Sequence, residues 1–508
     1  MSAVDYVIVG AGTAGAILAA RLSEDPDRQV LLLEAGPDYP DPATMPAYLR
    51  DGTVPPVDDP HDWGLTVTVT GDREGPLGRG RVVGGSSQTN DRGALRAPAA
   101  DFAEWAGLGL PAWDWSHVLP SYRRLETDVE FGTDPVHGDR GPVPITRWDR
   151  SELLPAMTGL LDATVAAGHP ECPDLNAPDA TGIAIYPQNR RGSERMSTAT
   201  THLAPARSRP NLTVRGDVRV DRIVIEGEQA VGVEAGGEVI RAGEVILAAG
   251  APYSPALLLR SGVGPADELP RSGVACRVDL PGVGRHLIDQ PGAVIPVVAT
   301  EAAGSPEWPR TQIVGRLPAI PGFAADHASY LCLFSGMRIP QLSAMAGADR
   351  LTLVMVGDMR PASRGAMWLP SADPSQQPVV DLRFYSEPGD LERMRAAYRH
   401  AWEIVQHPSF TATVDRFAAV DDALVGDDEQ LDGLLRAITN SRWNLLGGAT
   451  MGPPDSPQAV VDERCRVRGV SGLRVADASV VPVPLRAPAA LTCMMIGEHV
   501  ASMITEDH

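Results

Sequence analysis

The chain has 508 residues, of which 43% are hydrophobic, and 44 lysine and arginine residues stand against 65 aspartate and glutamate residues, for a net charge of −21. A chain of this length is usually too long to fold around a single hydrophobic core, so two domains are predicted. The acidic balance excludes nucleic acid and an anionic membrane as main partners. The N-terminus has no signal-peptide pattern and no apolar run reaches membrane-spanning length, so a cytoplasmic location is expected.

The five cysteines are scattered, with no pair at metal-ligand spacing. Neither a disulfide framework nor a metal site is therefore predicted, and the thiols are expected to lie in the core.

The first 34 residues follow the order strand, glycine turn, helix, strand. Residues 6–9 are apolar, residues 10–15 read Gly-Ala-Gly-Thr-Ala-Gly, residues 16–22 favour a helix, and residues 30–33 are apolar again and end at Glu34. This order is typical of a unit that binds a dinucleotide. The chain is therefore predicted to bind FAD or NAD, and these residues alone do not choose between them.

Each glycine of this turn has its own physical role. Gly10 makes the turn, Gly12 lets the backbone approach a pyrophosphate, and Gly15 lets helix and strand pack closely. The helix N-terminus faces the phosphates, and Glu34 accepts hydrogen bonds from a ribose diol, which disfavours a 2′-phosphate. Further contacts are expected from the neighbouring residues Thr13, Ala14 and Ala35.

Three further segments resemble signatures of the glucose–methanol–choline (GMC) oxidoreductases. Residues 80–90, GRVVGGSSQTN, resemble the first signature, and residues 250–264, GAPYSPALLLRSGVG, resemble the second. Residues 472–479 and 495–498 are similar to the family's closing strand and flavin-facing helix. The resemblance covers essentially the whole chain in the family's order, and it implies FAD as the cofactor.

The resemblance also implies the fold: an α/β chain, α+β overall, with a Rossmann-like FAD-binding domain and a substrate domain built on an antiparallel sheet covered by helices. The FAD-binding domain is expected to be discontinuous, over residues 1–150, 205–291 and 453–508. Residues 151–204 are expected to form a connecting segment on the substrate side, and residues 292–452 the substrate-binding domain.

Beyond the N-terminal unit, the resemblance places FAD contacts in glycine-rich loops and on the closing strand. Such loops present backbone N–H groups and small side chains, which suit close approach to a phosphate or a flavin ring. Asp477 is expected at the pyrophosphate and ribityl end, and Val218, in the strand-like residues 217–220, at the adenine. The implied contacts are Arg81, Val83, Gly84, Gly85, Ser86, Asn90, Val218, Ala249, Gly250, Asp477, Ala478 and Ala489.

Some members of the family bond FAD covalently through a histidine of the first signature. The matching position in this chain is Thr89, so non-covalent FAD is expected.

The segment after residue 292 changes character. Residues 349–359, 365–369 and 379–385 are predicted strands, and residues 390–406 are predicted to form a helix. Aromatic and sulfur side chains in this segment are more often core residues than cavity walls. The candidates for a cavity wall are Tyr330, Phe334, Met337 and Trp368.

The catalytic positions of the family do not match. In the family, hydride leaves the alcohol carbon for flavin N5 while a histidine takes the hydroxyl proton, and loss of such a base costs about 10²–10⁴-fold in rate. The family segment His-Pro-Val-Gly-Thr-Cys-Arg-Met-Gly matches residues 444–452 without gaps, so its histidine position is Asn444. The second position, a histidine or asparagine in the family, falls at Pro488, whose side chain has no donor or acceptor.

Several readings of this mismatch stay open. Asn444 can donate a hydrogen bond to the substrate or flavin, but an amide has no useful basicity. A second reading is a substrate that needs no strong base, such as an amine or one with an acidic hydroxyl, or a substrate that carries its own base. A base from elsewhere in the chain is a third reading, although His286 is expected to be structural and His499 to lie on the surface. Arg486 stays protonated and suits binding of a carboxylate or phosphate.

The expected function is FAD-dependent oxidation of a CH–OH or related donor by hydride transfer to flavin N5. The expected partners are a small-molecule substrate and, as acceptor, oxygen or an electron carrier. The alternatives left open are a light-driven decarboxylase, a lyase, an FAD protein that passes electrons to a redox carrier, and a flavoprotein that holds FAD only as a structural ligand.

Overall fold

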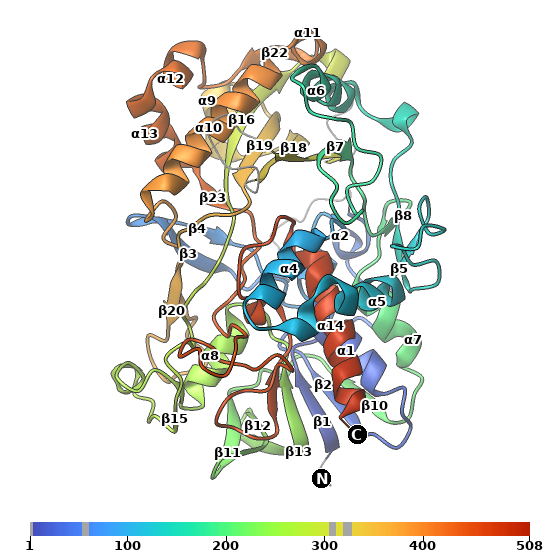
Figure 1. Cartoon of the computed structure of the whole chain (residues 1–508), viewed down its shortest axis with the longest axis vertical. Coiled ribbons are helices and arrows are strands. Elements are labelled where there is room, and N and C mark those ends of the chain that lie inside the picture. The colour runs from blue at the N-terminus through green and yellow to red at the C-terminus, as the bar shows by residue number, and fades with distance from the viewer. Residues whose placement is uncertain (1–3, 53–59, 304–310, 319–327, 508) are drawn as a thin grey trace.

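The computed structural model describes residues 4–52, 60–303, 311–318 and 328–507, with one large sheet at each end (Figure 1). The first sheet has seven strands in the order β10-β2-β1-β13-β12-β11, with β24 also paired to β13. The strands from β10 to β13 and β24 run parallel, whereas β12 and β11 are antiparallel. Their bounds are β1 (Val4–Val9), β2 (Val30–Leu33), β10 (Leu212–Arg215), β11 (Arg222–Glu226), β12 (Gln229–Ala235), β13 (Glu238–Leu247) and β24 (Leu473–Val475).

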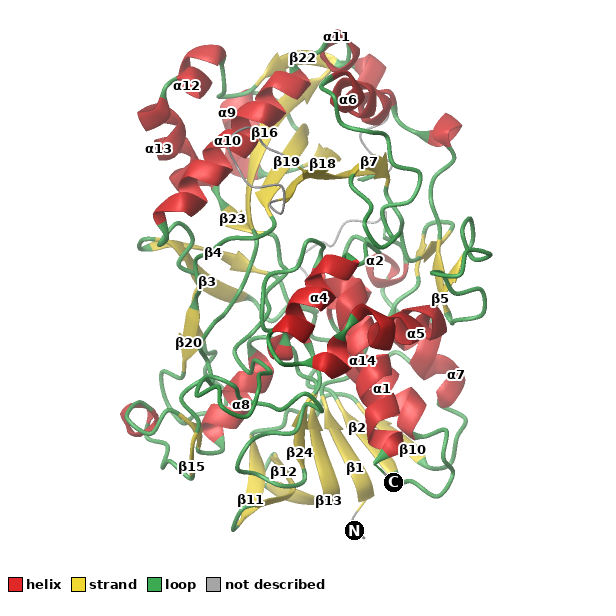
Figure 2. Ribbon diagram, in the orientation of Figure 1, coloured by secondary structure: helices red, strands yellow, loops and turns green. Residues whose placement is uncertain are grey.

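The helix α14 (Ala489–Glu506) packs against both α1 (Thr13–Leu22) and α5 (Trp115–Leu125) beside this sheet (Figure 2). The turn from β1 into α1 needs its glycines. Gly10 has a φ of 98°, and a Cβ on Gly15 would lie 1.9 Å from the carbonyl oxygen of Gly10. The predicted strand, glycine turn, helix and strand are therefore confirmed.

The second sheet is antiparallel throughout, in the order β22-β16-β19-β18-β17-β7, with β23 paired to β16. The helix α10 (Pro388–Val405) covers it, and the Tyr398 hydroxyl of this helix donates to the Val294 carbonyl oxygen at 3.1 Å. The predicted fold class is confirmed. The strands are β7 (Gly182–Ile185), β16 (Pro291–Ala299), β17 (Ile313–Pro318), β18 (Ala328–Met337), β19 (Leu351–Asp358), β22 (Val414–Phe417) and β23 (Asn440–Ser441).

A smaller sheet joins the two halves of the molecule. Its four strands have the order β20-β21-β3-β4 and lie between the large sheets in Figure 2. The strands β3 (Leu65–Thr70) and β4 (Arg73–Leu77) come from the first 150 residues. The strands β20 (Ala366–Trp368) and β21 (Val379–Asp381) come from the segment expected to bind substrate. This sheet therefore ties together two segments that the sequence assigns to different domains.

The three strands and the helix predicted after residue 292 are all present, as β19, β20, β21 and α10. The strand expected at residues 217–220 is wrong, because these residues form a loop. Asp217 has a positive φ of 55°, and the Val218 N–H donates to the Glu34 carbonyl oxygen at 2.8 Å. This contact bends the chain around the end of β2.

The other helices and strands are short or peripheral, and in the part that the structure describes no helix has the length and hydropathy needed to cross a membrane. These elements are α2 (Ala47–Arg50), α3 (Ser86–Thr89), α4 (Ala99–Gly107), α6 (Pro155–Ala166), α7 (Ala204–Ala206), α8 (Tyr253–Arg260), α9 (Pro340–Ala346), α11 (Pro408–Thr411), α12 (Asp422–Gly426), α13 (Asp428–Ile438), β5 (Glu126–Asp128), β6 (Val143–Ile145), β8 (Arg190–Arg191), β9 (Glu194–Arg195), β14 (Val263–Gly264) and β15 (Val278–Asp279).

All five cysteines are free thiols. Cys332 and Cys465 are buried, Cys172 and Cys493 are half-buried, and Cys276 is exposed. The expectation of core thiols is therefore wrong for Cys276.

Candidate active site

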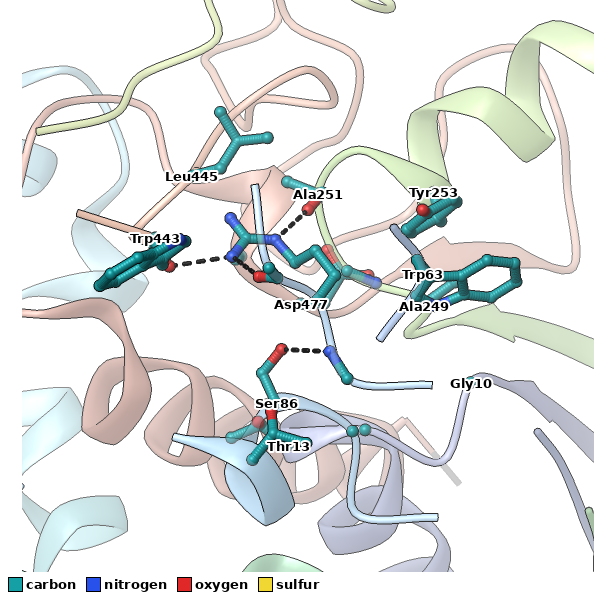
Figure 3. Close-up of a pocket in the computed structure, with 18 of the residues that line it drawn as sticks. Gly10, Thr13, Trp63, Ser86, Ala249, Ala251, Tyr253, Trp443, Leu445 and Asp477 are labelled. Carbon is teal, nitrogen blue, oxygen red and sulfur yellow. Dashed lines mark hydrogen bonds between the residues drawn. The ribbon is translucent and has the colours of Figure 1, made fainter. Parts of the chain in front are cut away.

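A cavity of about 590 Å³ extends from the carboxyl ends of the parallel strands to one face of the antiparallel sheet (Figure 3). Val9 and Leu33 at the ends of β1 and β2 line one end of it. Tyr330 and Phe334 on β18 and Met355 on β19 line the other. The cavity thus joins the predicted dinucleotide site to the sheet expected to bind substrate.

Glu34 lies at the dinucleotide end with its carboxylate already oriented. One oxygen accepts the Ala11 N–H at 3.0 Å, and the other accepts the Gly36 N–H at 2.9 Å. Burial raises the pKa of Glu34 to about 7, although these N–H donors act in the opposite direction. Each carboxylate oxygen keeps a lone pair for a further donor, as a ribose diol would supply.

The Asp477 side chain connects the loop that begins at Gly250 with its own loop after β24. Its Oδ2 accepts the Gly250 N–H at 2.8 Å and the Ser254 hydroxyl at 2.5 Å, while its Oδ1 accepts the Ser479 N–H at 2.8 Å. Burial raises the pKa of this carboxyl above its usual range. In Figure 3 Asp477 lies near the middle of the pocket, Trp443 lies on one side, and Trp63 and Tyr253 lie together on the other.

The structure brings most of the predicted site residues to this one cavity. Those that line it are Gly10, Gly12, Thr13, Ala14, Glu34, Ala35, Gly85, Ser86, Asn90, Val218, Ala249, Gly250, Asn444, Asp477, Ala478, Pro488 and Ala489.

Four predicted FAD contacts do not line the cavity. Gly15, Val83 and Gly84 are buried behind its wall, where the Gly84 N–H donates to the Ala11 carbonyl oxygen at 2.7 Å. Arg81 is exposed, and its guanidinium carbon lies 5.4 Å from the centroid of the Trp63 ring.

Asn444 is 9% exposed, and its side-chain amide is fixed at both ends. Its Oδ1 accepts the Ala489 N–H at 3.0 Å, and its Nδ2 donates to Gln290 Oε1 at 3.0 Å. The Gln290 amide is fixed in turn, because its Nε2 donates to the carbonyl oxygens of Leu485 and Ala487 at 2.7 and 3.2 Å. Asn444 therefore caps an open N–H of α14 and keeps one amide hydrogen for a ligand in the cavity.

Pro488 is the residue that precedes α14, and its side chain makes no capping hydrogen bond. It contributes an apolar surface to the cavity next to Asn444.

Among the described residues, no histidine lines the cavity. His286 is exposed on a loop outside it. His499 is buried, so its expected surface position is wrong. Its Nε2–H donates to the Ala112 carbonyl oxygen at 2.9 Å, its ring packs edge-on against Trp113, and burial lowers its pKa to about 4.

Arg486 also lies outside the cavity lining. Its guanidinium forms an ion pair with the buried Asp101, and its backbone N–H donates to the same carboxylate at 2.7 Å. This placement argues against the expected role of Arg486 in binding a substrate carboxylate, because its charge is already paired.

The substrate-side wall is mainly aromatic and sulfur-containing. The candidates Tyr330, Phe334 and Met337 line it together with Tyr186 and Met355. The fourth candidate, Trp368, is 40% exposed and does not line it.

Trp443 stands in a strained backbone conformation beside Asn444, with a φ of 59°. Its N–H donates to the Ser441 hydroxyl at 2.7 Å, and its carbonyl oxygen accepts from Arg79 Nη1 at 3.0 Å. Bulky residues rarely adopt positive φ, so the surrounding contacts hold this turn in place. The turn directs both Arg442 and Asn444 into the cavity wall.

Sequence reasoning missed several polar side chains of the site, among them Tyr186, Arg442, Asp91 and Gln290. Tyr186, Arg442 and Asp91 line the cavity, and Gln290 holds Asn444 from behind. Arg442 was visible two residues before Asn444, but no sequence pattern shows whether an arginine is paired in the fold.

The carboxylates that line the cavity differ in what they bind. Asp62 accepts the backbone N–H groups of Gly64 and Arg79 at 2.6 and 2.9 Å. Asp91 is exposed, and no other described residue forms a hydrogen bond or ion pair with its carboxylate. Asp91 is thus free to bind a ligand proton.

Comparison with known proteins matches family models of the GMC oxidoreductases over residues 4–292 and 361–497. A 5-(hydroxymethyl)furfural oxidase of Methylovorus sp. (strain MP688) is 36% identical, over 98% of both chains. An oxygen-dependent choline dehydrogenase of Escherichia coli (strain K12) is 34% identical, over 98% of this chain and 95% of the relative. The crystal structure of a pyridoxine 4-oxidase from Mesorbium loti is 27% identical, with a TM-score of 0.87 over 99% of this chain and all of that chain.

Proposed function

Because the chain belongs to the GMC oxidoreductase family, we propose that its cavity binds FAD together with a small alcohol or related donor and oxidises the donor at its CH–OH group. The observation that carries this proposal is the continuity of the cavity, from Glu34 at the dinucleotide end to Asn444 and Tyr330 at the other. The named relatives include two oxidases and a dehydrogenase, which does not favour the decarboxylase and lyase alternatives.

The residues at the dinucleotide end fit FAD. Gly10 and Gly12 leave the backbone of the β1–α1 turn open to a pyrophosphate, Glu34 offers acceptors for a ribose, and Asp477 fixes the loops that border the ring site. When bound, FAD supplies a flavin ring that accepts a hydride equivalent from the donor carbon.

We further propose that FAD is held without a covalent bond. The position at which some family members carry a bonding histidine is Thr89, which lines the cavity but offers only a hydroxyl. Acid precipitation of the protein is therefore expected to leave the flavin in the supernatant.

Asn444 occupies the position of the family's proton-accepting histidine in this proposal. Its Oδ1 is engaged by the Ala489 N–H, so the group left for substrate is the second hydrogen of Nδ2. A donor at this place orients the substrate hydroxyl and stabilises negative charge on its oxygen, but it does not remove the proton.

We assign proton removal to Asp91. Among the carboxylates that line the cavity, Glu34 and Asp477 hold the dinucleotide loops and Asp62 binds two backbone N–H groups, whereas no other residue that the structure describes binds the Asp91 carboxylate. Its segment borders the substrate-side wall, since a Cβ on Gly93 would fall 2.1 Å from the Tyr186 hydroxyl. A carboxylate oxygen there accepts the hydroxyl proton as the C–H bond breaks.

Replacing Asp91 with asparagine is expected to slow flavin reduction at saturating alcohol by about 10²–10⁴-fold, the usual loss for a general base. Asp91→Glu keeps the carboxylate and is expected to recover part of the rate. The measurement is anaerobic stopped-flow mixing across a pH series. The residual rate of Asp91→Asn should rise with pH, because hydroxide then takes the proton. An equal rate for Asp91→Asn and wild type would remove this role.

The function itself is tested by mixing the FAD-loaded protein anaerobically with a panel of primary alcohols, aldehydes and amines. Loss of the visible flavin absorbance with at least one donor is expected, and re-oxidation by air or only by an added carrier then identifies the acceptor. A flavin that stays oxidised with every donor in the dark, but changes on illumination with a fatty acid, would instead favour the decarboxylase.

A further inference from the structure

The side chain of Arg442 lies across one face of the antiparallel sheet, in a channel that two glycines leave open. Gly292 on β16 pairs with Gly357 on β19. A Cβ on Gly292 would lie 2.6 Å from Arg442 Cγ, and one on Gly357 would lie 2.9 Å from Arg442 Cδ. Larger residues at either position would close the channel. The sheet is therefore built to carry this side chain, which is 8% exposed, to the cavity wall.

The guanidinium at the end of this channel is poorly paired for a buried charge. Its carbon lies 3.4 Å from the centroid of the Tyr330 ring. Its one side-chain hydrogen bond with the described residues is long, at 3.4 Å from Nη1 to Gln290 Oε1, and that oxygen also accepts from Asn444 Nδ2. No carboxylate of the described chain lies within ion-pair distance of it.

Three other arginines with buried side chains bind carboxylates or backbone carbonyl oxygens through their Nη atoms at short distances. Arg96 pairs with Glu126, and Arg147 pairs with Asp128 and Asp174. Arg316 has no carboxylate partner among the residues that the structure describes, but it donates to four backbone carbonyl oxygens, at 2.5 to 3.2 Å. Arg442 has neither arrangement. A buried guanidinium with open donors is costly unless a ligand fills them.

We propose that Arg442 binds the carboxylate of the substrate, so that the donor oxidised in this cavity is an alcohol with a carboxylate group on an apolar body. This inference rests on the proposed function, because it places the anion in the oxidising site. The wall around Arg442 is apolar, with Phe334, Met337 and Met355, and matches an aryl or alkyl chain. One guanidinium suits a single carboxylate charge, because two of its N–H groups can donate to the two carboxylate oxygens.

The inference is tested first by binding, without turnover. The FAD-loaded protein is titrated with 4-methylbenzoate and with the neutral 4-methylbenzamide, which has nearly the same shape, and the visible flavin spectrum reports occupancy. Wild type is expected to bind the carboxylate about 10- to 100-fold more tightly, the range for a hydrogen bond to a charged group. Arg442→Met is expected to lose this preference. Equal affinity for both ligands in wild type, or a preference that survives in Arg442→Met, would overturn the proposal.

Controls separate charge recognition from folding. Arg442→Lys keeps a cation and is expected to retain part of the preference. Arg338→Met removes an arginine that is exposed and paired with Asp349, and it should bind both ligands as wild type does. Equal FAD content and a single cooperative melting transition in all variants show that each of them is folded. Should Arg442→Met fail to fold, the comparison of Arg442→Lys with wild type still decides the question.

A second arm distinguishes this inference from the proposed function. The two donors are 4-(hydroxymethyl)benzoate and 4-methylbenzyl alcohol, and the readout is anaerobic flavin reduction. A binding preference for the carboxylate without flavin reduction by either alcohol would support the Arg442 site and contradict the proposed oxidation. Flavin reduction by both alcohols at equal half-saturating concentrations, with no binding preference, would contradict the Arg442 site and support the proposed oxidation.

Discussion

Replacing Gly15 with alanine is expected to yield a protein that purifies without FAD. The added Cβ would lie 1.9 Å from the Gly10 carbonyl oxygen and 3.1 Å from the Ala248 Cβ. Neither neighbour can yield freely, because the Gly10 N–H donates to the Leu33 carbonyl oxygen and the Ala248 N–H to the Val9 carbonyl oxygen, both at 2.8 Å. The turn that faces the pyrophosphate must therefore move. Overpacking costs about 3 kcal/mol. Because this cost falls on the turn that binds FAD, it is expected to lower the affinity for FAD by about 100-fold.

The measurement is the ratio of flavin to protein absorbance after purification, followed by titration with FAD. Gly433, inside α13, is the matched control, since a Cβ there would meet nothing within 4 Å. Gly433→Ala should keep full FAD content and gain slight stability, because alanine restricts the unfolded chain. Full FAD content in Gly15→Ala would show that close packing of α1 on β1 does not control the cofactor site.

The local pattern was enough to predict the N-terminal unit, because its strands, glycines and acid are close in sequence. It failed at residues 217–220, where apolar residues alternate as in a strand. There the Val218 N–H binds the Glu34 carbonyl oxygen, and the positive φ of Asp217 turns the chain. The sheet that pairs Thr68 with Asp381 was likewise beyond local reasoning. Such contacts depend on the path of the whole chain and not on any short segment.

The candidate site shows the same contrast between what local sequence predicts and what distant contacts decide. Sequence proximity to Pro488 suggested Arg486 as the anion-binding group, but Asp101, which lies 385 residues away in the chain, pairs its charge. Arg442 has the opposite situation, because no described acid lies close enough to pair with it. Which of these two arginines stays available is decided by partners that are distant in sequence. The sequence could therefore locate the wall of the site but not its open donor.

Glu498 is the charged group on which α14 is anchored, and it is fully buried. Both of its oxygens accept from Arg21 on α1, at 2.9 to 3.0 Å. Arg124 on α5 donates to Oε2 at 3.0 Å, and His202 Nε2 lies 3.1 Å from Oε1. Burial alone would raise the pKa of Glu498, but these donors outweigh it and lower the pKa to about 2. One carboxylate thus holds together the helices beside the parallel sheet.

Replacing Glu498 with glutamine is expected to destabilise the protein by about 2–3 kcal/mol, somewhat below the 3–5 kcal/mol of a fully buried broken pair, because Arg21 and Arg124 are partly exposed. A group whose folded pKa is lowered stabilises the fold above its unfolded pKa, near 4.3, and loses this effect as the pH falls through about 2. The difference in apparent melting temperature between wild type and Glu498→Gln should therefore be full at neutral pH and should shrink below about pH 4.

Glu24→Gln is the matched control, because Glu24 also pairs with Arg21, at 2.8 Å, but is 52% exposed. An exposed pair contributes about 0–1 kcal/mol, so this variant should melt close to wild type at every pH. Equal decreases of the melting temperature in the two variants would mean that any negative charge near Arg21, buried or exposed, stabilises the fold to the same extent. A larger loss in Glu498→Gln that persists unchanged at pH 2 would mean that shape and packing at this position, and not its charge, hold α14 against α1 and α5.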